Sequence, residues 1–479
     1  MAFMMSKIQI LLPVLPSQEI YIRGYIFADD CNNITIYITE CMNNKELLSK
    51  KFNNSIFGYI GHNFPRKIFN KYDNIVHIKH NSLGVNKLII NGVELTNIES
   101  SVVMIYDYDI IKDSQTICIS NDDSFSKLVD IIHNEHGHKT TNHSKPNFKG
   151  PHWINTSMFL QHIYNYWRLL QWLFKSFKTE KLSIKYGNLI LAIIMDLILG
   201  YVALHLLPQE NEIITSSLMG VLERLINFLY SLLKWLMGAP VGLKLNNAFN
   251  NMLGKYFSYH VQLWWLFLDV SGEKLHIILH IYNYIGYLGL TFQIAVISDL
   301  ICLATFHSYC IYVYAARLFN IQISGLIALL RLFVGRKYNP LRGGIDSCEY
   351  TNQELFVGTV AFTMLLLLLP TTALYYVVFT GFRMVSLVVQ NILAKLIHFI
   401  QTSPIYATFL WFIGSPKVKG NISMEVLNED KNSALVLRLR LTSNSIAELV
   451  RMFKPPVNIP KRVEWSNMLS NILVGKQIV

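Results

Sequence analysis

Two carboxylates separated by one residue are the first feature of the sequence that could do chemistry. Asp107 and Asp109 flank Tyr108 directly after the apolar run SVVMIY. An Asp-x-Asp after a strand can hold the divalent metal that binds a nucleotide-sugar diphosphate, because two carboxylates supply hard oxygen ligands. Such a tripeptide is common by chance, and no glycine-rich phosphate loop accompanies it. A glycosyltransferase that acts in its own right through this pair is thus an alternative and not the favoured function.

Four histidines form the second candidate cluster. His133, His136, His138 and His143 could offer nitrogen ligands to zinc, but they lie in a polar stretch without a cysteine nearby. A solvated linker explains them more simply. The six cysteines contain no CxxC pair, and the sequence has no G-x-S-x-G or P-loop motif. We expect no metal and no cofactor.

Two further acids stand within long apolar segments. Asp196 lies between Leu189 and Leu207, and Asp299 is the single charge from His276 to Ala316. Charged groups inside a membrane are costly, so their default role is functional or partner-binding. We expect each to bind an Arg, a Lys or a hydroxyl on another helix. Proton transfer, or a lipid transporter or scramblase built on these acids, is the alternative.

A short basic loop precedes the longest uncharged run. The run extends from Leu355 to Phe379 and exceeds the roughly 20 apolar residues that cross a bilayer as a helix. Short loops rich in Lys and Arg stay on the cytoplasmic face. We expect five residues of this loop to contact phospholipid headgroups or partner subunits: Arg336, Lys337, Tyr338, Asn339 and Arg342.

Composition places the chain among integral membrane proteins. Of its 479 residues, 52% are hydrophobic and only 15% are charged, which is more apolar than an ordinary soluble protein. The net charge of +11 fits contact with anionic headgroups. It fits equally the positive-inside distribution of loop charges. Because the basic residues are dispersed, nucleic acid is not an expected partner.

Hydrophobic runs predict an α-helical multi-pass protein with six spans within residues 186–413. The predicted spans are Leu189 to Leu207, Ile213 to Met237, two that meet near Asp299 within His276 to Ala316, Leu355 to Phe379, and one within Val385 to Ile413. The count falls to five if Glu223 and Arg224 keep the second segment on the surface. Pro370 predicts a kink in the Leu355 span. The segment from Gly238 to Phe257 is expected to be a loop.

The flanking regions read as soluble or interfacial. Residues 1–150 predict a cytosolic α+β domain, because Ile34, Ile36 and Ile38 alternate with polar residues as in a half-buried strand. The pair Asn91 and Gly92 predicts a hairpin turn. Residues 151–185 mix aromatic residues with lysines, which is typical of an amphipathic linker in the headgroup zone.

Residues 414–479 predict a cytosolic tail. SALVLRLRL alternates Leu with Val and Arg, as a strand with one wet face does. Ser445 and Glu448 have the spacing of a capping box that opens a short helix. Both termini are therefore expected on the cytosolic side of the membrane.

Several long blocks resemble a known family. They are WLMGAPVGLKLN from Trp235, GLTFQIAVISDLICLATFHSYCIYVYAAR from Gly289, LFVGRKYNPLRGGIDSCEY from Leu332, and LLPTTALYYVVFTGFR from Leu368. In this order they are similar to the PIG-Q family, the Q subunits of phosphatidylinositol N-acetylglucosaminyltransferase. The resemblance covers roughly residues 185–415, and the two flanking regions resemble the family only loosely.

The resemblance implies a multi-spanning protein of the endoplasmic reticulum membrane. The family's complex transfers N-acetylglucosamine from UDP-N-acetylglucosamine to phosphatidylinositol on the cytosolic face, the first step of glycosylphosphatidylinositol anchor synthesis. The resemblance further implies that PIG-A holds the catalytic centre, that PIG-C and PIG-H are partners, and that the Q subunit organises or stabilises the assembly. No catalytic residue carries over to this chain.

Overall fold

The computed structural model of the chain forms two compact units. One unit contains residues 1–145, 173–191 and 404–455, and the other contains residues 146–172, 192–403 and 456–479. The structure describes the chain outside residues 1–5, 15–19, 29–32, 43–55, 63–73, 80–82, 91, 96–97, 118–123, 136–149, 178–182, 209–210, 239–245, 340, 342, 429–434, 461–464 and 478–479.

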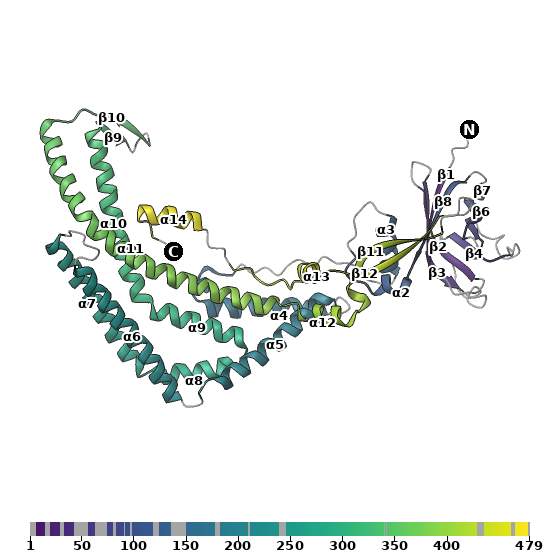
Figure 1. The fold of residues 1–479 in the computed structure, drawn as a ribbon, viewed down its shortest axis with the longest axis horizontal. Coiled ribbons are helices and arrows are strands. Elements are labelled where there is room, and N and C mark those ends of the chain that lie inside the picture. The colour runs from purple at the N-terminus through teal and green to yellow at the C-terminus, as the bar shows by residue number, and fades with distance from the viewer. Residues whose placement is uncertain are drawn as a thin grey trace. The chain divides into compact units, whose positions relative to one another are not determined.

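The first unit is built on a ten-stranded mixed sheet with the order β11-β12-β8-β1-β3-β2-β4-β5-β6-β7. Its strands, visible in Figure 1, are β1 (Ser6–Pro13), β2 (Ile20–Ala28), β3 (Asn33–Met42), β4 (Ile56–Ile60), β5 (Ile75–Ile78), β6 (Val85–Ile90), β7 (Val93–Glu94), β8 (Ile98–Tyr106), β11 (Lys419–Asn428) and β12 (Leu435–Ser443). β1 pairs in parallel with both β3 and β8. These central strands are rich in branched aliphatic residues, chiefly Ile, as strands buried on both faces are.

Both faces of the sheet's centre are covered. Ile34, Ile36 and Ile38 of β3 lie in one hydrophobic cluster, as their spacing predicts. Tyr37, on the opposite face of β3, packs with residues of α2 (Tyr108–Asp113) and α3 (Ser124–Glu135). The expectation of a half-buried β3 is wrong, because these two helices cover the second face.

The predicted turn and the predicted capping box are both confirmed. β6 and β7 form an antiparallel hairpin, and Gly92 has a φ of 77°, which only glycine adopts freely. Ser445 accepts a hydrogen bond from the backbone N–H of Glu448, and the Glu448 carboxylate accepts from the backbone N–H of Ser445, at the start of α13 (Ile446–Met452). Asn91 itself lies outside the described residues.

Strands from the carboxyl-terminal region complete the sheet of the amino-terminal region. β12 pairs in parallel with β8, with Val436 opposite Val103, and β11 pairs with β12 in antiparallel fashion. The sequence treats residues 414–479 as a tail separate from residues 1–150. In the structure their strands share one sheet, because β12 pairs beside β8 and its apolar face packs with α3. In the chain, α12 (Ile405–Ile413) and the short helix η3 (Pro416–Val418) come directly before β11.

The second unit is helical. It contains η1 (His152–Thr156), α6 (Asn211–Met237), α7 (Asn247–Gly272), α8 (Leu275–Gly286), α9 (Leu290–Ala304), α10 (Phe306–Phe333), α11 (Asn352–Thr402), α14 (Trp465–Val474) and most of both α4 (Met158–Phe177) and α5 (Ile184–Leu206). Among the described residues, four helices are long and apolar enough to cross a membrane: α5, α6, α10 and α11. This count differs from the five or six spans that the sequence predicts.

One long helix explains part of the difference. The predicted spans Leu355 to Phe379 and Val385 to Ile413 are not separate, because α11 runs without a break for 51 residues. The two predicted runs are separated only by residues 380–384, and this separating segment contains no proline. Figure 1 shows α10 lying beside the first half of α11 and running in the opposite direction. At 1.5 Å per residue α11 is about 76 Å long, more than twice the hydrocarbon thickness.

Helix breaks occur at unexpected places in the preceding segment. The sequence places a turn near Asp299, but α8 ends before Gly289 and α9 ends before Thr305. Gly289 has a φ of 137°, which other residues rarely adopt. The expectation that Gly238 to Phe257 forms a loop is wrong from Asn247 onward, because Asn246 caps α7 there by accepting from the backbone N–H of Phe249.

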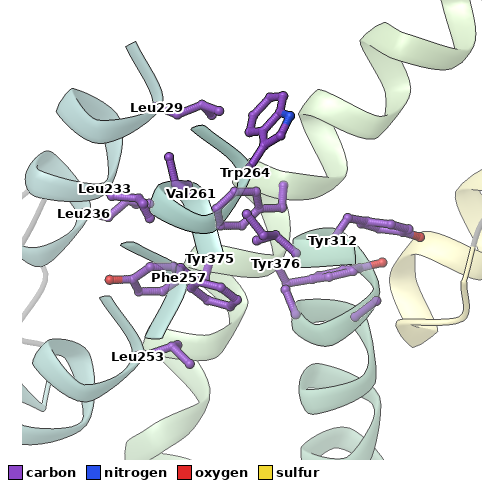
Figure 2. Packing of buried hydrophobic residues seen from close by; sticks show 14 of the residues in the cluster. Leu229, Leu233, Leu236, Leu253, Phe257, Val261, Trp264, Tyr312, Tyr375 and Tyr376 are labelled. Carbon is purple, nitrogen blue, oxygen red and sulfur yellow. The ribbon is translucent and has the colours of Figure 1, made fainter. Parts of the chain in front are cut away.

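Aromatic packing joins α6, α7, α10 and α11. Phe257 and Trp264 of α7, Tyr312 of α10 and Tyr375 of α11 are fully buried in one cluster, which Figure 2 shows. Tyr375 donates a hydrogen bond to the Asn250 side chain, so its polar end has a partner inside the cluster.

Candidate functional site

Asp196 lies near the middle of α5 and binds the first turn of α9. Its Oδ1 accepts a hydrogen bond from the backbone N–H of Thr291 at 2.8 Å, and its Oδ2 accepts from the Thr291 hydroxyl at 2.6 Å. A carboxylate at this place satisfies N–H groups that have no partner inside the helix and meets the positive end of the helix dipole. The predicted hydroxyl partner on another helix is present, and it belongs to this chain.

Gly289 lets the Asp196 carboxylate approach α9. A Cβ atom on Gly289 would lie 2.5 Å from Asp196 Oδ2, closer than real contacts allow. Gly200 of α5 also lies against Gly289, and a Cβ on Gly200 would come 2.7 Å from the Gly289 carbonyl carbon. Two glycines therefore bring α5 and the start of α9 together, as small residues do between packed helices.

The hydrogen-bond network around Thr291 extends to two more buried side chains. His162 Nε2 lies 3.1 Å from the Thr291 hydroxyl oxygen, and because the hydroxyl hydrogen points to Asp196, His162 is the donor in this contact. Gln293 donates from Nε2 to the carbonyl oxygens of Gly200 and Gly286 at 2.8 and 3.0 Å. The break between α8 and α9 thus has its backbone groups paired from both sides.

Asp299 has the same role at a different helix. Its carboxylate accepts from the Ser157 hydroxyl at 2.5 Å and from the backbone N–H groups of Met158 and Phe159 at 2.8 and 3.1 Å. These groups form the amino-terminal end of α4. Asp299 therefore joins α9 to α4, as Asp196 joins α5 to α9. These hydrogen-bond partners of Asp196 and Asp299 all lie at helix starts, so both acids are arranged as structural caps.

The basic loop forms an antiparallel hairpin of β9 (Arg336–Asn339) and β10 (Gly344–Ser347) between α10 and α11. In the register of this hairpin, Lys337 lies opposite Asp346 and Tyr338 lies opposite Ile345. Asn339 closes the turn, because it donates to Asp346 at 2.8 Å and accepts from the Leu341 backbone N–H at 3.0 Å.

The hairpin presents basic and apolar side chains together. Arg336 and Lys337 are exposed, Tyr338 is 53% exposed, and Leu341 at the tip is 95% exposed. Arg342 lies outside the described residues. An isolated two-stranded hairpin has little stability in water, and here β9 also contacts α10. The structure does not bring the hairpin together with Asp196 or Asp299 into one site within the second unit, since each has its own separate set of partners.

The Asp-x-Asp pair has a structural role. Asp107 is the cap of α2 and accepts a hydrogen bond from the backbone N–H of Ile110, while Asp109 lies in the first turn of the helix. Acids at these positions favour a helix start. Within the described part of the chain, no group of three His, Cys, Asp or Glu could hold a metal. His136, His138 and His143 lie outside that part.

Sequence reasoning missed the neutral polar residues of the helical unit. His162, Thr291, Gln293 and Asn250 are buried and pair with helix ends or with one another. Thr291 and Gln293 stand two residues apart in an otherwise apolar run that also contains Asp299. Their polarity in such a run is the sequence pattern that could have identified them. Buried polar groups in membrane helices need partners, so Thr291 and Gln293 indicate helix contacts as the two acids do.

Comparison with known proteins identifies the family. A family model described as "N-acetylglucosaminyl transferase component (Gpi1)" matches residues 148–420, which is more than half of the chain. The chain belongs to this Gpi1 family. The match contains both capping acids, the basic hairpin and all four candidate spans. No solved structure matches the chain.

Individual relatives agree with the Gpi1 assignment. Subunit Q of phosphatidylinositol N-acetylglucosaminyltransferase from Mus musculus is 35% identical over 311 residues, which are 63% of this chain and 53% of the relative. The Homo sapiens subunit Q is 42% identical over 224 residues, 46% of this chain and 29% of the relative. The N-acetylglucosaminyl-phosphatidylinositol biosynthetic protein gpi1 of Schizosaccharomyces pombe is 27% identical over 263 residues, 54% and 40% of the two chains. The matches span about half or less of these relatives.

Proposed function

We propose that this chain is a non-catalytic membrane subunit of the complex that transfers N-acetylglucosamine from UDP-N-acetylglucosamine to phosphatidylinositol. In this role it organises or stabilises the assembly in the endoplasmic reticulum membrane, with both termini in the cytosol. Its partners are the other subunits of that complex, of the kinds known as PIG-A, PIG-C and PIG-H. Membership of the Gpi1 family is the observation that carries this proposal.

The geometry of the capping acids supports a scaffold role. The carboxylate oxygens of Asp196 and Asp299 each accept hydrogen bonds from the first turn of a neighbouring helix. A proton carrier needs a group that can exchange protons with water, whereas the oxygens of both carboxylates are already hydrogen-bonded to N–H and O–H groups at the start of a neighbouring helix. The acids therefore fix the arrangement of α4, α5 and α9, on which partner subunits would assemble.

The basic hairpin is the part of the scaffold proposed to face the lipid headgroups. Arg336, Lys337 and Arg342 would attract the phosphate of phosphatidylinositol or of a neighbouring phospholipid. Tyr338 is suited to the zone between acyl chains and water, because its ring is apolar and its hydroxyl is polar. Asn339 contributes by holding the turn through Asp346. No cofactor is required for this role.

Affinity capture of the full chain from detergent tests the assembly. The captured material should contain the PIG-A, PIG-C and PIG-H type subunits by mass spectrometry, and it should transfer labelled N-acetylglucosamine to phosphatidylinositol. Capture that brings none of these subunits and no transferase activity would refute the proposed complex.

Neutralisation of the hairpin tests the headgroup contact separately. The variant with Arg336→Gln, Lys337→Gln and Arg342→Gln should lower the activity of the complex severalfold while the subunits are recovered in the same amounts. Lys274→Gln is the matched control, because Lys274 is exposed just before α8 and away from the hairpin. If the triple variant keeps full activity and full recovery, the hairpin has no part in the reaction.

A further inference from the structure

The ten-stranded sheet has two edges that differ in protection. β7 at one edge has two residues, whereas β11 at the other has ten, and every residue from 421 to 427 is exposed. Natural sheets shield their edges by short strands, prolines, inward charges or bulges, because unpaired N–H and C=O groups recruit further strands. β11 has no proline, and its register irregularities are confined to its two ends.

The apolar face of the sheet continues onto this open edge. Ile422, Met424 and Val426 lie opposite Leu441, Leu439 and Leu437 of β12, on one face. Leu439 is only 5% exposed, because it packs in the cluster under α2 and α3. Ile422, Met424 and Val426 are 42%, 61% and 54% exposed. Three consecutive inward positions of β11 are therefore apolar and uncovered.

We propose that β11 is a dimerisation edge, at which a second copy of this chain adds its own β11 in antiparallel pairing. The strand is self-complementary when the two-fold axis passes through Met424. Met424 then faces its counterpart, and Ile422 faces Val426 of the second copy on the apolar face. Ser423 faces Glu425 on the polar face, so no like charges are opposed.

Charge favours this pairing of two copies. Lys419 begins β11, so antiparallel pairing about Met424 sets the Lys419 residues of the two copies at opposite ends of the paired strands, where the two ammonium groups do not meet. An axis through Glu425 would instead oppose two carboxylates, which is destabilising. In this two-fold pairing the β11 edges of both copies are hydrogen-bonded to each other, so only the short β7 edges remain unpaired. The inference is independent of the proposed transferase role.

Disulfide cross-linking of the full chain in detergent micelles tests the register. The six native cysteines are replaced by serine, and Met424→Cys is introduced. Paired residues in an antiparallel ladder have Cα atoms about 4.5–5.5 Å apart, within disulfide range. Met424→Cys should therefore form a covalent dimer under mild oxidation. Leu427→Cys is the matched control: its two copies would be about 20 Å apart, so it should cross-link only when mixed with Asn421→Cys.

Edge charge tests the dimer without cysteines. Met424→Lys opposes two ammonium groups on the apolar face and should raise the dimer dissociation constant at least about tenfold. Ser423→Lys, on the polar face and opposite Glu425, should leave it unchanged. A wild-type chain that is monomeric by native mass spectrometry overturns the proposal. So does a Met424→Cys chain that cross-links only to a different protein, because a partner strand would then occupy this edge.

Discussion

Thr291 donates two hydrogen bonds to Asp196, one from its backbone N–H at 2.8 Å and one from its hydroxyl at 2.6 Å. A carboxylate in the middle of the most apolar candidate span thus holds the start of α9. Asp299 repeats the arrangement by holding the start of α4. The two acids form a series of caps from α5 to α9 to α4, and this series predicts that their removal separates helices.

Asp196→Ala should destabilise the helical unit by about 1–3 kcal/mol, because the Thr291 N–H loses its acceptor in a buried place. Thr291→Val keeps the backbone N–H bond but removes both hydroxyl bonds, the one to Asp196 and the one from His162, and should cost about 1–3 kcal/mol. Thermal unfolding of the full chain in micelles measures both. An Asp196→Ala chain as stable as the wild type would show that the cap contributes nothing.

Asp299 and Ser157 should be energetically coupled. Ser157→Ala and Asp299→Asn each weaken the cap of α4, so a double-mutant cycle should give an interaction energy of about 0.5–3 kcal/mol. Ser216→Ala is a suitable control, because the Ser216 hydroxyl bonds only within its own helix, to the Ile213 carbonyl at 3.0 Å. Additive effects of Asp299→Asn and Ser157→Ala would contradict the cap.

Gly289→Ala should destabilise the helical unit although it adds only one methyl group. The new Cβ would meet the Asp196 carboxylate, and a φ of 137° is strained for alanine. We expect a loss of at least about 1–3 kcal/mol. Gly381→Ala is the matched control, because a Cβ there meets nothing within 4 Å and α11 should gain about 0.5–1 kcal/mol in helix propensity. Equal stability of the two variants would argue against close contact at Gly289.

His77 gives the sheet unit a pH dependence. Its ring is 2% exposed, its Nδ1 accepts from the Asn86 amide, and burial lowers the pKa of His77 below its usual value of 6.5. Because the folded state stays neutral while the unfolded state takes up a proton, stability is fully present above pH 6.5 and falls as the pH drops below it, by at most about 1.4 kcal/mol per pH unit. His77→Gln should flatten that slope.

Hydrogen exchange of β5, corrected for its intrinsic pH dependence, measures this effect. His62→Gln serves as the control, because His62 is exposed after β4. An unchanged slope in His77→Gln together with a wild-type slope in His62→Gln would assign the pH dependence to another group.

Local patterns in the sequence predicted local structure well. The alternation of Ile34, Ile36 and Ile38 and the spacing of Ser445 and Glu448 act within a few residues, and the structure confirms them. The pairing of Val436 with Val103 could not be predicted, because strand partners more than 300 residues apart leave no local pattern. The second covered face of β3 was missed because the local pattern does not show that α2 and α3 pack on it.

The candidate site was predictable in kind but not in detail. Hydropathy singled out Asp196 and Asp299, since charges in apolar runs are rare. Their actual partners, the starts of α9 and α4, depend on how helices pack in three dimensions. The unbroken α11 was missed because residues 380–384 neither favour nor forbid a helix strongly, and tertiary packing decided.

The most direct test of the central claim is a transferase assay on the purified full chain alone, with labelled UDP-N-acetylglucosamine and phosphatidylinositol in micelles. The scaffold account predicts no glycolipid from the chain alone, and product only when the remaining subunits of the complex are added. Glycolipid formed by the chain unaided, and lost in the Asp107→Asn and Asp109→Asn variant, would contradict it.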